Sequence, residues 1–258
     1  MPQTIYRNIK GDKLAMIPVS ILVSSHNNLS YCKQMFDSLK RCTKYPYELI
    51  WIDADSGVEM RKWLETIKNE QPTTIIFEKA ISLSKAYNIG LDNSESEYVA
   101  IVDTDVILTY NWLTKLLKWM ETDKIGQCGM LSNFAPSWQC YGPSKFSSFD
   151  EIQEFAKTVN NHELRDCRWC NISHTLYNRQ ALTDVGGLDE EYFTCMELDF
   201  SKKMRELGWR IVVALDVWVY HYGHKTWELI HKTRPTWASK LDAGQRLVRR
   251  RFPKDYRG

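Results

Sequence analysis

Two patterns of hydrophobic and polar positions alternate along the first half of this chain. Short apolar runs rich in β-branched residues are typical of buried strands, and they occur at 19–23, 48–53, 73–78 and 97–102. After each run, apolar residues recur every three or four positions, which predicts an amphipathic helix. The expected inner faces are Cys32, Met35, Phe36 and Leu39; Met60, Trp63, Leu64 and Ile67; Leu83, Ala86, Tyr87 and Gly90; and Leu113, Leu116, Leu117 and Met120.

Strands that alternate with helices predict the α/β class. Right-handed crossovers then give a mostly parallel sheet with helices on both faces. Ser56 precedes the second helix and is predicted to cap it. Ligands of such sheets bind outside the carboxyl ends of the strands. The side chains that follow those ends are polar: Ser24, Ser25 and His26, then Asp53, then Asp103 and Asp105.

The pattern becomes less regular after residue 131. A stretch rich in Ser, Pro and aromatic residues predicts a long loop, and a helix with Ile152, Phe155, Ala156 and Val159 on its inner face follows. Beyond it we expect a strand at 171–177, a short helix before 186 and a helix over 196–208. Two further strands are expected at 210–215 and 217–221. With no internal repeat and no linker before about residue 226, we expect a single domain with a C-terminal appendage.

Asp103 and Asp105 are the first candidates for chemistry. In a strand, residues two apart point the same way, so the two carboxylates would repel each other. A hard divalent cation such as Mg²⁺ or Mn²⁺ would resolve this repulsion. The pattern Asp-x-Asp is common by chance, and alone it is more often structural. His221 and His224 follow another predicted strand end, and an imidazole beside carboxylates favours Mn²⁺ over Ca²⁺.

Composition fits an ordinary soluble protein. Of the 258 residues, 43% are hydrophobic and 26% are charged, and no apolar run approaches the roughly 20 residues needed to cross a bilayer. The cysteine count is seven, an odd number, and no signal peptide is recognisable. We therefore expect reduced thiols and a cytoplasmic protein.

Two local features leave alternatives open. The net charge is +2, yet residues 246–258 carry six cationic side chains against Asp255, so the remainder is mildly acidic. This basic tail is expected either to be a solvated, partly disordered end or to contact lipid phosphates or an anionic acceptor. Cys167, Cys170 and His174 resemble a zinc half-site, but without a fourth ligand at suitable spacing, buried free thiols are favoured.

Four segments of the chain together resemble a known family. They are VSILVSSHNN, ELIWIDADSG, SLSKAYNIGLDNSESEYVAIVDTDVIL and VGGLDEEYFTCMELDFSKKMRELGWRIVVALDVWVYH. In this order they are similar to the GT-A nucleotide-sugar glycosyltransferases, family two in particular, over residues 17 to 224. The resemblance implies a Rossmann-like GT-A domain at 1–225, with a nucleotide-binding half at 17–131 and an acceptor half at 132–225. Residues 226–258 would form a lid and the basic tail.

The resemblance also assigns donor-binding residues. By position, Ser25, His26 and Asp53 would hold the nucleoside, and Asp103 would contact the ribose or the diphosphate. UDP is the first choice of nucleotide, because an acid at position 53 suits uridine recognition. A departure is Asp53-Ala54, where the family usually has two polar residues.

A metal site is implied next to the donor. Asp105 and His221 would bind Mn²⁺ or Mg²⁺, which neutralises the charge developing on the departing diphosphate. His224 and Lys225 could donate hydrogen bonds to the diphosphate once a C-terminal lid closes. Lys85 is a further phosphate-binding candidate, although a solvated helix lysine is the more common situation.

The catalytic base belongs, by resemblance, to the helix after a Gly-Gly-hydrophobe-Asp-Glu turn, found here at 186–190. The usual Glu-Asp pair is Met196-Glu197, so Glu197 occupies the base position and Asp199 is a second candidate. Such a base accelerates attack by the acceptor hydroxyl about 10²–10⁴-fold. A Gln-x-x-Arg-Trp motif, typical of processive synthases, is absent from the sequence.

The sequence thus predicts a metal-dependent, inverting, non-processive transferase. It would move one sugar from a nucleoside-diphosphate sugar to a carbohydrate or lipid-linked acceptor, with peripheral membrane contact through the tail and no nucleic-acid partner. Two alternatives stay open. A sugar-nucleotide pyrophosphorylase would normally carry a glycine-rich loop where this chain has SSHNN. A non-catalytic sugar- or nucleotide-binding protein on the same fold is favoured only by Met196.

Overall fold

The four apolar runs of the first half form the parallel part of one sheet. A computed structural model describes residues 4–7, 19–70, 73–79, 81–122, 124–136 and 138–253. In this model the four runs form strands that are parallel to one another and lie in the spatial order β4-β3-β2-β5. Their bounds are β2 (Val19–Ser25), β3 (Glu48–Ala54), β4 (Thr73–Glu78) and β5 (Tyr98–Ile101). A short strand, β1 (Thr4–Arg7), pairs antiparallel with β4 at the edge.

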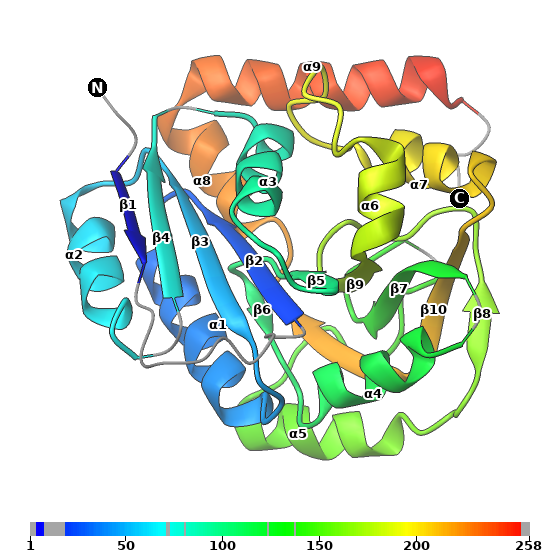
Figure 1. Cartoon of the computed structure of the whole chain (residues 1–258). Coiled ribbons are helices and arrows are strands. Elements are labelled where there is room, and N and C mark those ends of the chain that lie inside the picture. The colour runs from blue at the N-terminus through cyan, green and yellow to red at the C-terminus, as the bar shows by residue number, and fades with distance from the viewer. Residues whose placement is uncertain are drawn as a thin grey trace.

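The second half of the chain extends this sheet beyond β5 (Figure 1). The order continues β9-β7-β10-β6, with β8 paired to β10. The bounds are β6 (Val106–Ile107), β7 (Ile125–Ser132), β8 (Leu164–Asp166), β9 (Thr175–Asn178) and β10 (Arg210–His221). Only β7 and β10 are parallel here. The expected α/β class is confirmed, but the sheet is mixed, because the parallel pairings expected throughout are concentrated in the first half.

Helices cover both faces of the sheet, as the alternation along β2 requires. Val19, Ile21 and Val23 face α1 (Leu29–Cys42), α2 (Val58–Ile67) and α4 (Trp112–Met120). Leu22 lies on the opposite face, in a second cluster with α3 (Leu83–Asp92), α6 (Arg179–Val185) and α7 (Glu197–Glu206). Figure 1 shows these two groups of helices on either side of the sheet.

Three further helices complete the described part of the chain. α5 (Phe149–Thr158) is fixed by Gln153, whose amide binds the backbone at Leu108 and Tyr110. α8 (Lys225–Thr233) and α9 (Pro235–Arg251) form the C-terminal appendage, and α9 crosses the top of the molecule in Figure 1. A third apolar cluster, with Ala54, Ile230, Trp237, Ala238 and Leu241, joins them to the end of β3.

The first part of the predicted basic tail, residues 246–251, is the end of helix α9, so this part does not have the disordered form that was one of the two expected forms. Helix α9 continues to Arg251, whose guanidinium contacts Glu191 and Tyr192 at 2.8 Å. The helix is ordered because Leu241 and Val248 are buried on its inner side. Residues 254–258, which carry the last charges of the predicted tail, lie outside the described residues.

Three local predictions differ from the structure. The N-cap of α2 is Gly57, not Ser56, and the Ser56 hydroxyl instead accepts a hydrogen bond from the Asn27 backbone at 2.6 Å. Strand β7 was not expected, because its sequence IGQCGMLS lacks the β-branched run that marks the other strands, although all its residues are buried. The two strands expected at 210–221 are one strand, β10, with a bulge at 215–217.

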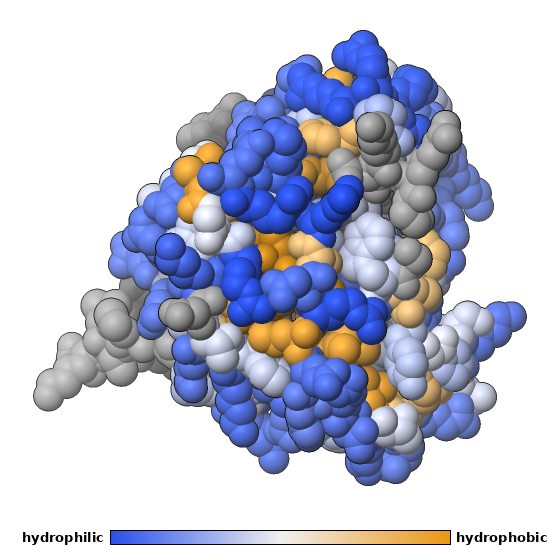
Figure 2. Space-filling model, turned by 90° about the vertical axis from the view of Figure 1, so that its right-hand side faces the viewer, coloured by the Kyte–Doolittle hydropathy of each residue, from blue (hydrophilic) through white to orange (hydrophobic). Residues whose placement is uncertain are grey.

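Polar side chains cover most of the side shown in Figure 2, and apolar ones are visible mainly in the middle of that face. This distribution is ordinary for a folded domain. Within the described ranges, we find no helix with the length and apolar character needed to cross a bilayer.

Candidate active site

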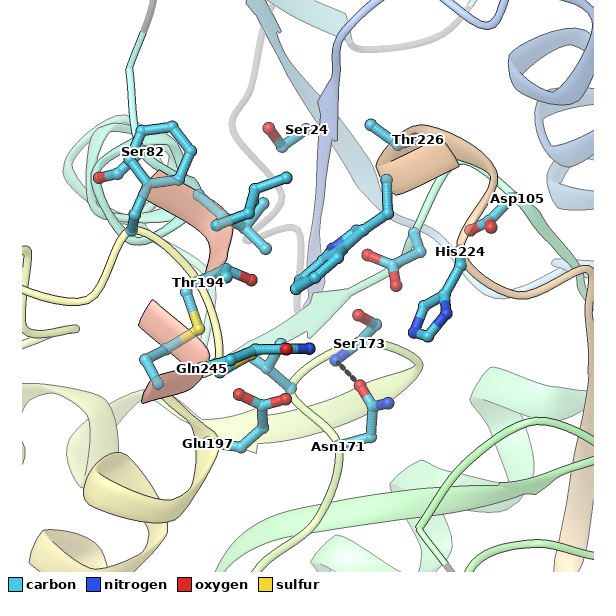
Figure 3. A pocket seen from close by; sticks show the side chains of 18 of the residues that line it. Ser24, Ser82, Asp105, Asn171, Ser173, Thr194, Glu197, His224, Thr226 and Gln245 are labelled. Atoms are coloured by element: carbon cyan, nitrogen blue, oxygen red, sulfur yellow. Dashed lines mark hydrogen bonds between the residues drawn. The ribbon is translucent and has the colours of Figure 1, made fainter. Parts of the chain in front are cut away.

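A cavity of about 450 Å³ lies at the carboxyl ends of the parallel strands. This is where ligands bind in sheets of this topology. Its floor comes from the ends of β2 and β3 and the 103–105 segment, and α8 and α9 form its roof. One wall comes from Phe134, Pro136, Trp138 and the 169–173 segment, and another from residues 193–198. Figure 3 shows polar side chains from several of these elements, among them Ser24, Asp105, Asn171, Glu197 and Gln245, around the same space.

Asp103, Asp105 and His221 form a compact cluster at one end of the cavity. One ligand atom from each residue lies within 4.8 Å of the other two. Strands β6 and β10 bring them together, because His221 pairs with Val106 and the Tyr222 backbone N–H donates to the Asp105 carbonyl at 2.9 Å. His221 Nε2 then lies 3.1 Å from Asp105 Oδ1.

Electrostatics at this cluster favour bound positive charge. Burial raises the pKa of Asp103, and the neighbouring Asp105 carboxylate raises it further. Burial acts in the same direction on Asp105, but the hydrogen bond and charge of His221 outweigh it and lower the pKa of this carboxyl. The pKa of His221 is raised, because the two carboxylates outweigh its own burial.

The donor set fits a divalent cation. Two carboxylates and one imidazole match the ligand preferences of Mn²⁺, and Mg²⁺ also accepts carboxylate oxygens. The buried negative charge of two aspartates is only partly compensated by one histidine, so a cation would remove a real electrostatic conflict. Residues 103, 105 and 221 are therefore the metal-binding candidates of this chain.

Ser25 and His26, at the end of β2, line the cavity. His26 Nδ1 lies 2.7 Å from the Ala54 carbonyl, which only accepts hydrogen bonds, so this nitrogen carries a proton. Burial lowers the pKa of His26, which keeps the ring neutral with Nε2 as an acceptor. The His26 ring also packs against Trp237 of α9, at 4.8 Å between ring centroids.

Asp53 lies beneath the residues that line the cavity and is not one of them. Its side chain is fully buried and does not line the cavity. Oδ2 accepts from the Ser25 hydroxyl at 3.2 Å, and Oδ1 accepts from the Ser56 backbone N–H at 3.1 Å. Burial raises the pKa of Asp53, and these hydrogen bonds oppose that effect. In this structure Asp53 therefore positions the residues that face a ligand.

Glu197 is the first residue of α7 and lines the cavity at the end opposite the metal candidates (Figure 3). Its Oε2 is buried and has no hydrogen-bond partner among the described residues. Burial, with a smaller contribution from the charge of Asp103, raises the pKa of Glu197 to about 7. A carboxyl with this pKa can accept a proton near neutral pH, as a general base must.

The other base candidate, Asp199, is not in the cavity. Its carboxylate pairs with Lys203 at 2.7 Å on the flank of α7. Successive helix residues diverge by 100°, so Asp199 points away from the direction of Glu197. Of the two acidic candidates, the structure brings only Glu197 to the site.

The predicted phosphate-binding residues His224, Lys225 and Lys85 lie in different positions relative to the cavity. His224 lines the cavity with its ring against Phe134 and Trp227. Lys225 contributes its backbone N–H, which donates to Asp105 Oδ2 at 3.1 Å, while its ammonium group pairs with Glu228. Lys85 is exposed on α3 and does not line the cavity.

The Gly-Gly turn before α7 is held by Asn88 of α3. The Asn88 side chain accepts from the Leu188 backbone N–H at 2.9 Å and donates to the Leu188 carbonyl at 2.8 Å. Gly187 has φ +82°, and an added Cβ would lie 3.0 Å from Asn88 Oδ1, so both conformation and space require glycine here. This contact fixes the loop that leads to Glu197.

Several residues that line the cavity were not predicted from the sequence. No ligand-binding role was predicted for Asn171, Ser173, Thr194 or Gln245, which lie in irregular segments or in the C-terminal appendage. The aromatic richness of 132–148 and 169 was a usable signal, since Trp138 and Trp169 do line the cavity.

Cys167 and Cys170 lie side by side next to β10. Both are free cysteines; Cys170 is buried, and its Sγ lies 3.1 Å from Cys167 Sγ. The metal-binding cluster found among the described residues does not include them. The preference for free thiols over zinc stays a prediction, as does the cytoplasmic location.

Comparison with known proteins gives the family. The model of "Glycosyl transferase family 2" matches residues 20–186, well over half of the chain. The chain belongs to glycosyl transferase family 2. The expected class of enzyme, a transferase, is that of the family.

Curated relatives of this family 2 chain agree with the assignment. It is 25% identical over 184 residues to the succinoglycan biosynthesis protein ExoM of Rhizobium meliloti, covering 67% of this chain and 55% of that protein. It is also 25% identical over 143 residues to an uncharacterized glycosyltransferase of Rickettsia bellii, covering 55% of this chain and 19% of that protein. The chain thus matches at most about half the length of these relatives.

Solved structures confirm the expected GT-A architecture. The family 2 chain superposes on GalNAc-T7 with a TM-score of 0.65 at 16% identity, covering 81% of this chain and 44% of that one. For the mannosyltransferase PcManGT of Pyrobaculum calidifontis the TM-score is 0.59 at 15% identity, covering 90% and 74%. For S. aureus TarS 1-349 with UDP-GlcNAc it is 0.58 at 18%, covering 78% and 57%.

Proposed function

We propose that this chain transfers a single sugar from a nucleoside-diphosphate sugar to an acceptor hydroxyl, in a reaction that requires Mn²⁺ or Mg²⁺. The observation that carries the proposal is the shared cavity, which has the cation-binding cluster at one end and a buried, unpartnered carboxylate at the other. Structures of the same fold were solved with UDP, GalNAc and Mn²⁺ or with GDP-Man and Mn²⁺, which supports the donor class.

The residues at the first end of the cavity would hold the donor. Asp105 and His221 would bind the cation, and Asp103 would approach it or the diphosphate. When bound, the cation supplies positive charge that stabilises a departing diphosphate. Ser25 and His26 would contact the nucleoside, with UDP as the first choice, and His224 lies within the same cavity as a hydrogen-bonding group for phosphate oxygens.

Glu197 would act at the other end as the general base. Its unpartnered Oε2 can accept the proton of an acceptor hydroxyl as that oxygen attacks the anomeric carbon. A base on the side of the sugar opposite the leaving group belongs to an inverting transfer. Helices α8 and α9 would exclude water, because they already close over the cavity.

The test is a transfer and hydrolysis assay with UDP-, GDP- and dTDP-sugars, with Mn²⁺ and with EDTA. We expect one donor to be consumed only with the cation. Glu197→Gln should lose about 10²–10⁴-fold in rate while still binding the nucleotide. Asp105→Asn should lose the cation dependence of binding. Failure of every donor to bind or react with Mn²⁺ would refute the proposal.

The same assay separates the non-catalytic alternative. A binding protein would take up the nucleotide sugar with Mn²⁺ but leave it intact, and Glu197→Gln would then change nothing. The buried carboxyl with a pKa near 7 favours the enzyme, because a binding site has no need of an unpartnered ionisable group.

The acceptor and the membrane contact form a second part of the proposal. We propose a carbohydrate or lipid-linked acceptor, and a peripheral membrane contact through the outward face of α9, where Lys240, Arg246 and Arg250 are exposed. Co-sedimentation with vesicles containing anionic lipid tests the contact. Binding that is lost with neutral vesicles and at high salt would support it, and equal binding to both vesicle types would refute it.

A further inference from the structure

Helix α9 presents a regular stripe to the cavity. The α9 residues that line it are Trp237, Leu241, Gln245 and Val248, which follow one another at helical spacing. Three of them are apolar and buried. Gln245 is the polar member of the stripe, and a polar residue on a core-facing helix position usually has a specific partner.

The Gln245 amide has no hydrogen bond to another residue in the described part of the chain. Figure 3 shows the side chain extending into the cavity, with its amide on the same side as Glu197, Asn171 and Ser173. Asn171 uses its Oδ1 to accept from the Ser173 backbone N–H at 3.0 Å. An unpartnered amide therefore lies at the end of the cavity that holds the unpartnered Glu197 carboxylate.

The position of Gln245 is fixed because α9 packs against the loop before Glu197. An added Cβ on the neighbouring Gly244 would lie 3.0 Å from the Thr194 carbonyl, so the helix backbone rests directly on the loop before Glu197. Each end of α9 is anchored as well. Arg234 Nη1 pairs with Asp55 at 2.7 Å before the helix, and Arg251 pairs with Glu191 at 2.8 Å at its end.

We propose that Gln245 is a specificity-determining residue that hydrogen-bonds a hydroxyl group of the sugar being transferred. An amide offers one acceptor and two donors, which matches a hydroxyl that both donates and accepts. The donor sugar must lie between the diphosphate at Asp105 and the base at Glu197, and Gln245 reaches this space from the roof. The inference rests on the proposed function, and it adds a residue beyond the 20–186 region that the family model matches.

The experiment compares two ligands on three proteins by calorimetry with Mn²⁺. The ligands are the nucleoside diphosphate and the corresponding nucleotide sugar, and the proteins are wild type, Gln245→Ala and Ser239→Ala. Ser239 is an exposed, uncharged position on the same helix and serves as the control. Gln245→Ala should weaken nucleotide-sugar binding about tenfold, equivalent to about 1.4 kcal/mol, and change the diphosphate Kd less than about twofold.

A second arm identifies the hydroxyl. Donor analogues that each lack one sugar hydroxyl are titrated against wild type and Gln245→Ala. The analogue that lacks the recognised hydroxyl should bind both proteins equally, because the interaction is already absent. If every analogue retains the tenfold difference, Gln245 does not contact a sugar hydroxyl and the inference is wrong.

Other outcomes separate this inference from the proposed function. If wild type binds no nucleotide sugar, both fail. If wild type binds normally and Gln245→Ala weakens both ligands equally, the residue only supports the closed roof, and this inference alone fails. It also fails if Gln245→Ala changes only the KM for the acceptor.

Discussion

Glu197 is subject to two opposing influences at the start of α7. The N–H groups of a helix N-terminus favour a carboxylate, whereas burial in the cavity wall favours the neutral acid. Burial is the larger effect and raises the pKa of Glu197 to about 7. The protonation state of this one side chain therefore changes within the range in which enzymes are assayed.

The first prediction concerns the pH dependence of the rate. A general base acts only when it is deprotonated, so kcat/KM should rise about tenfold per pH unit below the pKa and level off above about pH 7. A pH profile of sugar transfer by the wild-type protein measures this. A profile that is flat between pH 5 and 8 would exclude Glu197 as the base.

The second prediction concerns stability at the same residue. The pKa of Glu197 is raised from 4.5 in an unfolded chain to about 7, so ionising it in the fold costs free energy. This cost is absent below pH 4.5, grows as the pH rises to about 7, and is fully present above. Glu197→Gln should therefore raise the free energy of unfolding at pH 8 by up to about 3 kcal/mol and change it little near pH 4.

Urea unfolding of wild type and Glu197→Gln at the two pH values provides the measurement, with Asp199→Asn as the matched control. Asp199 is paired with Lys203, so its neutralisation should not stabilise the protein at pH 8. Equal stability of wild type and Glu197→Gln at pH 8 would mean that the carboxyl is well solvated.

At the scale of elements, α9 packs closely against Thr194 at Gly244. Its missing Cβ lets α9 approach the Thr194 backbone, and any side chain there would meet Thr194 at 3.0 to 3.4 Å. The roof and the loop before α7 are thus packed as one unit. Displacing α9 would move the Gln245 side chain and open the apolar contacts of Leu241 and Val248.

The third prediction follows from this contact. Gly244→Val should lower the free energy of unfolding by about 1–3 kcal/mol, because overpacking forces the helix away from the loop. Ala243→Val is the matched control, since Ala243 is exposed on the same helix. Denaturant titration of both variants checks the difference. If both variants are equally stable, α9 is not seated on Thr194.

The same scale explains what the sequence could predict. Strands β2 to β5 were predictable because each contains a short apolar run rich in β-branched residues, and their helices because apolar residues recur at a period of 3.6. Strand β7 was missed because Ile125 is its only β-branched residue and two glycines interrupt its apolar positions, although all its residues are buried. The resemblance predicted a lid over residues 226–258 but not its helices, because the inner stripe of α9 is short and interrupted by Gly244 and Gln245.

At the candidate site, the side chains that were expected to lie together do so where a motif coincides with a strand end. Asp103, Asp105 and His221 meet as expected because each lies at or beyond the end of a strand in one sheet. The resemblance could give the position of Asp53 but not its burial, which depends on Trp51, Ser25 and Ser56 packing around it. It could not separate Asp199 from Glu197, because the direction of a helix side chain depends on how the helix docks.

At the scale of the whole molecule, the cavity is enclosed by parts that are distant in sequence. Strand ends near residues 25 and 105 form its floor, and helices after residue 225 form its roof. A ligand that fills the space would contact all of them. Binding should therefore stabilise the folded state as a unit rather than one segment.

The fourth prediction is a thermal shift. A nucleotide sugar with Mn²⁺ at about 100 times its Kd should stabilise the protein by about 2.7 kcal/mol, which corresponds to about 5–10 °C in Tm for a domain of this size. The same nucleotide sugar with EDTA, or with the Asp105→Asn variant, should give a much smaller shift. A shift of equal size with EDTA would show that the acidic cluster does not hold a cation.

The bulge of β10 has a consequence for His221. Residues 215–217 are extra relative to β7, and they bend the strand so that its last residues pair with β6. Asp216 secures the bend, since its carboxylate accepts from Trp119 Nε1 at 2.9 Å and its carbonyl accepts from Lys115 at 2.7 Å. Mutation of Asp216, which lies outside the cavity, should therefore change the angle at which the His221 imidazole faces Asp105.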